Sequence, residues 1–140
     1  NGCFKKLGLK NTNIDRKILD SKAKIKGLEN FTSAKDIAYI LEKIYKKELI
    51  NKDISEKCLA FLKKQKIRDR IPKMLPSYIS VAHKTGLENG GCHDAGIIFT
   101  KEGDFLICVL TQHNFKTNHS AKKFISKIAQ KLYFAFNKNE

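Results

Sequence analysis

The chain has 140 residues, a length that suits one domain of ordinary size with a buried core. Hydrophobic residues make up 41% and charged residues 30%, which is typical of a globular protein and argues against a disordered one. The net charge of +14 would suit an anionic partner such as nucleic acid. However, 25 of the 28 basic residues are lysines spread along the whole chain, and only three are arginines, the residue type that most often reads bases. We therefore expect no nucleic-acid binding.

Neither a membrane span nor a metal site is expected in this sequence. No apolar run approaches the roughly 18 residues that a membrane-spanning helix needs. The four cysteines do not pair with each other or with histidine at the spacing of a zinc site, and no second pair completes a ligand set with Cys92 and His93. We expect no metal and no cofactor. Because the chain opens on a segment typical of the end of a helix, we also expect it to be part of a longer protein.

Residues 1–31 are predicted to hold the end of a helix followed by a long loop. The helical segment covers residues 4–9, and Gly8 supplies its stop. Residues 11–31 carry polar and turn-forming side chains without a sustained period, which predicts an extended surface loop.

Residues 32–76 are predicted to be mainly helical. Thr32 or Ser33 caps the first helix, whose apolar positions recur at helical spacing: Ile37, Ile40, Leu41 and Ile44. Asp53 opens a second helix with Glu56 as the partner in a capping box. The buried stripe of this second helix is expected to consist of Ile54, Cys58, Leu59 and Leu62. An irregular stretch follows, bounded by Pro72 and Pro76.

Residues 77–140 are predicted to form a sheet and a terminal helix. Three strand-like runs cover residues 78–82, 95–100 and 105–110, with turns at 88–91 and 102–104. The second and third runs are apolar at nearly every position, which is typical of strands covered on both faces. Asn118 or Ser120 caps a long helix with one apolar face: Ala121, Phe124, Ile125, Ile128, Leu132, Tyr133 and Phe136. Helices, three antiparallel strands and a C-terminal helix define an α+β fold.

The most informative stretch is His83-Lys84-Thr85-Gly86, which follows the first strand-like run and precedes a turn. A lysine brings positive charge beside a nucleophile and an anionic substrate. A threonine hydroxyl can hold a carboxylate, and a glycine lets a substrate lie against the strand. A Lys-Thr-Gly at the end of a strand that opens a hairpin is the third signature of the penicillin-recognising serine hydrolases.

In this motif and in several other segments, the chain resembles the C-terminal half of class A β-lactamases and related penicillin-binding serine hydrolases. The segments that carry the resemblance occur in the right order and spacing: residues 6–12 and 15–16 entering an omega-like loop, 30–34 leaving it, 69–72 and 75–76 before the motif strand, and 93–98 in the strand after it. The resemblance covers nearly the whole chain and implies one β-lactamase-like domain portion, with the helix end and omega-like loop at 1–31, the helical part at 32–76 and the sheet and terminal helix at 77–140.

The resemblance also implies roles for individual residues. Lys84 would keep the electrostatic field near the nucleophile positive, and Thr85 would bind the carboxylate of a β-lactam or a peptide terminus. Gly86 would let the substrate lie alongside the strand, and the backbone N–H of Leu87 would be one of two oxyanion-hole donors. Where the family often has a carboxylate-binding arginine, this chain has Ala95. In relatives lacking that arginine another one serves, and its counterpart here is Arg70; the alternative is a solvated arginine paired with Asp69.

Two departures from the family pattern concern the chemistry. No Ser-Asp-Asn occurs, and the two Ser-x-x-Lys matches, at Ser21 and Ser120, are of the kind expected by chance in a lysine-rich chain. The nucleophilic serine is therefore expected outside this chain. At the position of the glutamate that activates the deacylating water in class A β-lactamases, the resemblance places Ile18, and the nearby Asp20 is out of register.

The function implied by the resemblance is that of the C-terminal part of a β-lactamase-like serine hydrolase. The complete protein would recognise β-lactams or peptidoglycan peptides and hydrolyse a cyclic amide through an acyl-enzyme. The alternative is a catalytically inactive cell-wall binding or scaffolding module with the same fold. By the same resemblance we expect an extracytoplasmic location, and we expect the isolated chain to be inactive and either self-associated or bound to its missing N-terminal half.

Overall fold

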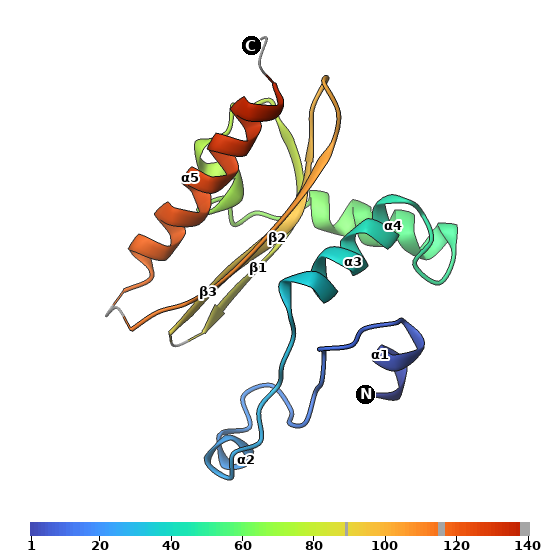
Figure 1. Ribbon diagram of the computed structural model, residues 1–140, viewed down its shortest axis with the longest axis vertical. Coiled ribbons are helices and arrows are strands. Elements are labelled where there is room, and N and C mark those ends of the chain that lie inside the picture. The colour runs from blue at the N-terminus through green and yellow to red at the C-terminus, as the bar shows by residue number, and fades with distance from the viewer. Residues whose placement is uncertain (89, 115–116, 138–140) are drawn as a thin grey trace. The chain divides into compact units, whose positions relative to one another are not determined.

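A computed structural model describes residues 1–88, 90–114 and 117–137 of the chain. Contacts divide the chain into two compact units, Asn1–Ile37 and Ala38–Glu140. The elements are α1 (Gly2–Lys6), α2 (Ser21–Ile25), α3 (Ala34–Tyr45), α4 (Lys52–Lys63), the 3-10 helix η1 (Ile71–Met74), β1 (Ser80–Glu88), β2 (Gly91–Phe99), β3 (Phe105–Gln112) and α5 (His119–Phe136) (Figure 1). The predicted α+β fold, with a three-stranded antiparallel sheet and a long C-terminal helix, is confirmed.

The first unit consists of two short helices and a loop that is closed at its base. Gly8 has a φ of 79°, so it ends the α1 segment as predicted. An antiparallel bridge joins Asn13 to Phe31, and the stretch between them was wrongly expected to be extended throughout, because it contains α2. The Asp20 carboxylate caps that helix by accepting a hydrogen bond from the Ala23 N–H at 2.9 Å.

Side-chain capping sets the start of both longer helices in the middle of the chain. The Ser33 hydroxyl accepts from the Asp36 N–H at 3.1 Å, so Ser33 caps α3. At α4 the predicted capping box at Asp53 is wrong, because Asn51 is the N-cap and accepts from the Ile54 N–H at 2.9 Å. Asp53 falls in the first helical turn, where it forms an i,i+4 ion pair with Lys57.

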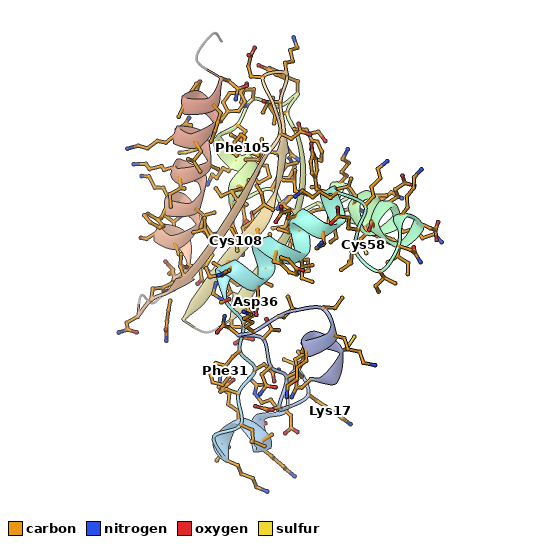
Figure 2. All side chains as sticks on the ribbon, turned by 45° about the vertical axis from the view of Figure 1, so that its right-hand side comes forward. Lys17, Phe31, Asp36, Cys58, Phe105 and Cys108 are labelled. Carbon is orange, nitrogen blue, oxygen red and sulfur yellow. The ribbon has the colours of Figure 1, made fainter. Side chains whose placement is uncertain are left out.

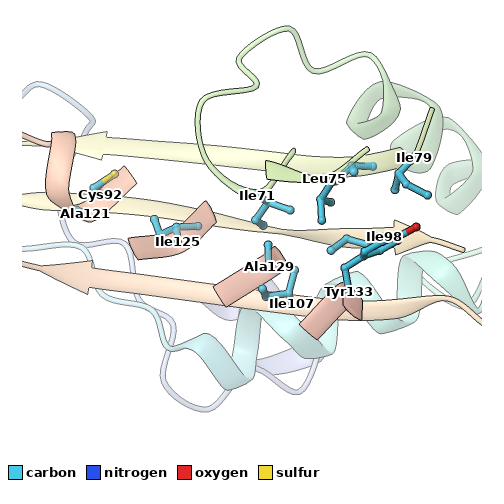
Figure 3. Close-up of a cluster of buried hydrophobic side chains, with 11 residues drawn as sticks. Ile71, Leu75, Ile79, Cys92, Ile98, Ile107, Ala121, Ile125, Ala129 and Tyr133 are labelled. Carbon is cyan, nitrogen blue, oxygen red and sulfur yellow. The ribbon is translucent and has the colours of Figure 1, made fainter. Parts of the chain in front are cut away.

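The sheet has the order β1-β2-β3, with β2 in the centre. Register pairs Lys84 with Ala95 and Thr85 with Asp94, so alternate residues of β1 and β2 face opposite sides. On one side α5 and η1 cover the sheet and form the core cluster: Ile71, Leu75, Ile79, Val81, Cys92, Ile98, Ile107, Ala121, Ile125, Ala129 and Tyr133 (Figure 3). The 3-10 helix lies where only an irregular stretch was expected.

On the other side of the sheet, α3 and α4 meet β2 at an aromatic ring. The Lys63 ammonium of α4 lies 4.0 Å from the centre of the Phe99 ring, and the Tyr45 ring of α3 is 6.4 Å away from it. Tyr45 also donates a hydrogen bond to Asp104 in the β2–β3 turn at 2.9 Å. Polar and aromatic contacts therefore contribute to holding the helices on this face, together with buried apolar residues such as Ala82 and Ile97.

Burial in β3 and α5 differs from the expected pattern. β2 is buried at six of its nine positions, whereas Ile107 is the single buried residue of β3, because β3 has a partner on one side only within the described sheet. In α5, Phe124 and Phe136 were wrongly assigned to the buried face, since they are 55% and 59% exposed. Asn118 is the N-cap residue of α5. In the predicted turn at 88–91, Asn89 lies outside the described residues.

We expect Gly96→Ala to destabilise the chain by about 1–3 kcal/mol, because the site has no room for a methyl group. An added Cβ would lie 2.5 Å from both the Ala82 carbonyl oxygen and the His83 Cβ on the neighbouring strand. Gly86→Ala is the matched control on the same hairpin, since its Cβ would lie 3.2 Å from a side-chain atom, the His93 Cδ2, and not 2.5 Å from a backbone atom. Urea unfolding of both variants measures the difference, and equal losses would contradict the packing argument.

Candidate functional site

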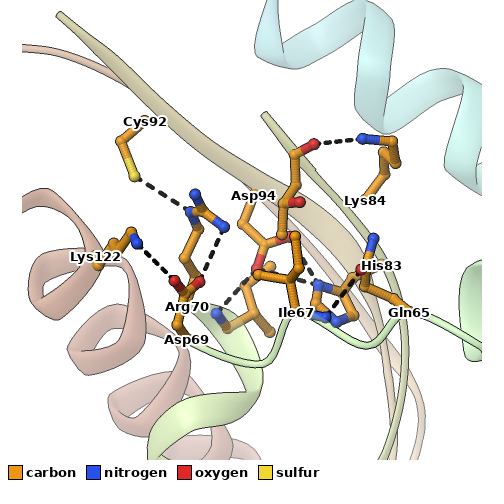
Figure 4. A network of polar contacts seen from close by, with 11 residues as sticks. Gln65, Ile67, Asp69, Arg70, His83, Lys84, Cys92, Asp94 and Lys122 are labelled. Atoms are coloured by element: carbon orange, nitrogen blue, oxygen red, sulfur yellow. Dashed lines mark hydrogen bonds and ion pairs between the residues drawn. The ribbon is translucent and has the colours of Figure 1, made fainter. Parts of the chain in front are cut away.

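The Lys-Thr-Gly motif lies on β1, an outer strand of the described sheet. Lys84 is exposed on the face away from α5, and its ammonium donates to the Thr85 carbonyl oxygen at 2.5 Å (Figure 4). Thr85 points to the opposite face and is 8% exposed. Leu87, at the end of the strand, is 53% exposed. The motif therefore presents a lysine and a strand backbone to the surroundings while its threonine is part of the interior.

Gly86 faces His93 across the hairpin. The Cδ2 atom of His93 lies 3.2 Å from the place that a Cβ on Gly86 would occupy, so the glycine makes room for the imidazole ring. Burial lowers the pKa of His93, although the charge of Glu88 opposes the shift. Its Nδ1 accepts from the Thr111 N–H at 3.1 Å, which ties the ring to β3. A neutral histidine thus supports the motif strand from its neighbour.

Arg70 is almost fully buried, at 2% exposure, and its guanidinium is held from two directions. Its Nη1 pairs with the Asp69 carboxylate at 2.9 Å, and its Nε donates to the Cys92 sulfur at 3.2 Å. Asp69 also pairs with Lys122 of α5 at 2.6 Å. Arg70 thus pairs with Asp69, as in the alternative given in the sequence analysis. It is buried, however, whereas that alternative was a solvated arginine.

Asp69 is ionised at neutral pH in this cluster. Burial pushes the pKa of its carboxyl upward, but Lys122 and Arg70 outweigh burial and hold the pKa below its usual value. A carboxyl with a lowered folded-state pKa stabilises the fold at pH values above its unfolded pKa. That contribution is lost as the pH falls through the folded pKa, so the Arg70–Asp69–Lys122 contacts weaken in acid.

A buried His83–Asp94 pair lies on the same face as Thr85. Both side chains have no exposed surface, and His83 Nδ1 lies 2.9 Å from Oδ1 and 3.2 Å from Oδ2 of Asp94. The carboxylate also accepts from the Ile71 N–H at 3.0 Å. Asp94 therefore links β1, β2 and the start of η1 (Figure 4). The first residue of η1, Ile71, directly follows Arg70 in the chain.

The structure brings some of the predicted residues together and separates others. Arg70 contacts β2 at Cys92, two positions from the cross-strand partner of Thr85. Lys84 faces the other side of the sheet, opposite the buried Ala95. The assigned roles of Lys84, Thr85, Gly86, Leu87 and Arg70 remain predictions, since they concern a substrate. The sequence reasoning missed Asp94 and its contacts, and the one signal for it was its position on the strand directly opposite the motif.

Residues of the omega-like loop and the two serine candidates have local structural roles. Ile18 is 83% exposed, and the neighbouring Asp20 is engaged as the cap of α2. Ser21 is the first residue of that helix, and Lys24, its partner in the Ser-x-x-Lys match, pairs with Glu29 at 3.4 Å. Ser120 is exposed in the first turn of α5. Among the described residues, no base is hydrogen-bonded to the hydroxyl of either serine.

Other reactive side chains form no further site in the described part of the chain. Within the ranges given above, no group of three or more His, Cys, Asp or Glu side chains could hold a metal ion. Burial, with a smaller effect of the Asp94 charge, raises the pKa of the Cys108 thiol to about 11, so this thiol is protonated at neutral pH. Among the helices formed by the described residues, none has the length and apolar character needed to cross a membrane.

The sheet, the motif strand and the covering C-terminal helix define a β-lactamase-type fold, and solved structures agree. A single-substitution mutant of PBP-A, in its acyl-enzyme complex with penicillin G, is 24% identical with a TM-score of 0.85 over 99% of this chain. A beta-lactamase from Sphaerobacter thermophilus is 24% identical with a TM-score of 0.86 over 100%. A single-substitution variant of the TLA-1 extended spectrum beta-lactamase is 26% identical with a TM-score of 0.84 over 94%.

The sequence pattern of the Beta-lactamase enzyme family matches residues 1–136, so the chain belongs to this family. It spans 50%, 53% and 51% of the three solved chains, in that order, or about half of each. A search of curated protein sequences found no match.

Proposed function

We propose that this chain supplies the Lys-Thr-Gly strand that lines one side of the active site of a β-lactamase-like serine hydrolase. The complete enzyme would act on β-lactams or peptidoglycan peptides. The observation that carries the proposal is the placement of Lys84, Thr85 and Gly86 on an outer strand, in a chain that belongs to the Beta-lactamase enzyme family. An outer strand leaves backbone groups on one side unpaired within the sheet, and these can bind an extended substrate.

In the proposed reaction a serine from outside this chain attacks the carbonyl carbon of the cyclic amide. The amide C–N bond breaks, the leaving nitrogen takes a proton, and an acyl-enzyme ester remains until water hydrolyses it. The exposed Lys84 ammonium would stabilise the negative charge near the serine. The Leu87 N–H would donate to the developing oxyanion. Thr85 and Arg70 would bind the substrate carboxylate after a small rearrangement, because both are largely buried.

The second candidate is a catalytically inactive module that binds cell-wall peptides. It is favoured by one observation, the exposed Ile18 where the class A pattern has a glutamate. Covalent labelling separates the candidates: the complete protein, including the sequence upstream of Asn1, is incubated with a fluorescent penicillin and analysed by mass spectrometry. One adduct per molecule supports the hydrolase. Reversible binding without an adduct supports the inactive module, and no binding overturns both.

We expect the complete enzyme to deacylate slowly, because Ile18 cannot activate water. Stopped-flow measurement with a chromogenic β-lactam should show a burst of about one equivalent followed by a slow steady rate. Ile18→Glu should raise the steady rate, whereas Leu19→Glu, at a neighbouring exposed position, should not. Rapid turnover without a burst in the unmodified protein would show that another group, such as Asp20, is the base.

The isolated chain is proposed to associate through β3 with the N-terminal half of its domain or, when that half is absent, with itself. β3 is an outer strand of the described sheet and carries Phe105 and Val109 on the side of α5 and Leu110, 36% exposed, on the opposite side. We expect sedimentation velocity to show dimers or larger species. Leu110→Lys should shift the chain toward monomer, and Leu87→Lys on β1 is the matched control. A compact wild-type monomer with cooperative unfolding would contradict this expectation.

The location and partners follow from the same proposal. An extracytoplasmic protein would meet β-lactams and peptidoglycan directly, and resistance to such antibiotics would then depend on the complete enzyme. Nucleic acid is not a proposed partner, and a steep loss of duplex DNA binding with increasing salt would be needed to support one.

A further inference from the structure

The solvent-facing side of α5 combines lysines and phenylalanines without any acidic residue. Its five members, Lys123, Phe124, Lys127, Lys131 and Phe134, are termed the α5 outer face. All are exposed, and the two phenyl rings retain 55% and 51% of their surface in solvent. The 18 residues of α5 include no aspartate or glutamate. Nothing in the proposed hydrolase reaction uses this surface, which lies on the helix that backs the sheet.

Helical geometry places these residues together. At about 100° per residue, Lys123, Lys127, Lys131 and Phe134 fall within an arc of about 80°, with Phe124 at its border. The buried stripe, which includes Ile125, Ala129 and Tyr133, lies on the opposite side against the core. Figure 2 shows nitrogen-tipped side chains extending from α5 on the side away from the sheet. With a rise of 1.5 Å per residue, the surface runs about 16 Å along the helix.

The positive charge on this face is not neutralised within the described residues. Lys122, which is half-buried, pairs with Asp69 at 2.6 Å, but none of the nine ion pairs found among those residues involves Lys123, Lys127 or Lys131. Three ammonium groups therefore stand one helical turn apart with no carboxylate between them, beside two exposed rings. Such a surface suits an anionic partner that also offers an apolar phase.

We propose that the α5 outer face binds the surface of an anionic phospholipid bilayer, with the lysines at the lipid phosphates and the two phenyl rings at headgroup depth. An anionic polymer without apolar or aromatic groups would attract the lysines but would make no favourable contact with the rings. A bilayer binds both the lysines and the rings, since a basic helix with exposed aromatic residues lies in the plane of the membrane interface. Each lysine near an anionic membrane strengthens binding to it. Three such lysines together raise the partition coefficient onto the membrane by about 100-fold. The chain would thus be a peripheral membrane binder through a surface separate from the β1 motif.

Vesicle co-sedimentation tests this proposal with the chain as it is, independently of any β-lactam chemistry. Vesicles of equal parts phosphatidylglycerol and phosphatidylcholine should pellet the chain, and pure phosphatidylcholine vesicles should not. The triple variant Lys123→Gln, Lys127→Gln, Lys131→Gln should bind about 100-fold more weakly. Its matched control removes three exposed lysines elsewhere, Lys64→Gln, Lys66→Gln and Lys101→Gln, and should bind within about threefold of the wild type, because screening limits distant charges.

The phenyl rings distinguish a bilayer from other occupants of this face. Phe124→Ser with Phe134→Ser should weaken vesicle binding by about tenfold or more, whereas Phe61→Ser on α4, at a position 74% exposed, should not. Circular dichroism confirms that each variant is folded. Equal losses in the two lysine sets, or no loss on removing the rings, would overturn the proposal in favour of a general polyanion effect. Loss of self-association in the ring variant, with vesicle binding unchanged, would assign the face to another protein chain instead.

Discussion

Asp94→Ala is expected to destabilise the chain by about 3–5 kcal/mol, the usual range when one partner of a buried pair is removed. The substitution leaves the His83 Nδ1 and the Ile71 N–H without their shared acceptor in a site with no exposed surface. It also leaves a cavity under the hairpin. Since total stability of a domain is about 5–15 kcal/mol, a loss of this size is a large part of it. Urea unfolding followed by circular dichroism measures the change.

Asp53→Ala is the matched control, because its carboxylate is paired but 71% exposed. An exposed pair of this kind contributes about 1 kcal/mol or less. A cycle with His83→Ala and the double variant tests the contact itself: the second substitution should cost much less once the first has been made. Similar losses in Asp94→Ala and Asp53→Ala, or additive losses in the cycle, would show that Asp94 does not hold β1 and η1 together.

In the complete protein, Lys84→Ala is expected to slow acylation by a β-lactam by about 10²–10³, the effect of removing one group that stabilises developing charge. Lys84 is exposed and its ammonium donates to the carbonyl oxygen of the neighbouring Thr85, so the fold should not depend on it. The thermal midpoint should therefore change little. Burst-phase kinetics with the complete protein measure acylation directly, and Lys84→Arg should retain part of the rate because it keeps the charge.

The control for Lys84 is Lys101→Ala, which removes an exposed lysine from the turn after β2. It should leave acylation unchanged. The isolated chain is expected to form no covalent adduct at all, because Ser21 and Ser120 lack an activating base. An adduct on either serine, or equal acylation by Lys84→Ala and Lys101→Ala variants, would show that the roles taken from the family do not apply here.

The pattern of apolar residues was sufficient to predict the elements that pack by one face. The α+β order, the helix after Ser33 and the three strands follow from local periodicity, and periodicity is a property of the sequence alone. Errors arose where two local signals competed. Asn51 caps α4 because its side chain reaches the Ile54 N–H, whereas Asp53 two residues later has a charged partner one turn away.

Tertiary structure alone decided which side chains share a site. The sequence identified Lys84, Thr85 and Gly86 as a motif, but the register of the hairpin turns Thr85 toward Asp94 and Lys84 toward the opposite face. Likewise Phe124 fits the apolar period of α5 and still lies in solvent, because the sheet contacts a narrower arc of the helix than the apolar residues cover. The burial of a side chain depends on which segment packs against its face of the helix or strand. A single sequence does not state which segments pack together. Arg70 is an example: its pairing with the adjacent Asp69 was one of the alternatives open from the sequence, but its burial was not, because Cys92 and Lys122, which complete the cluster, come from two other segments.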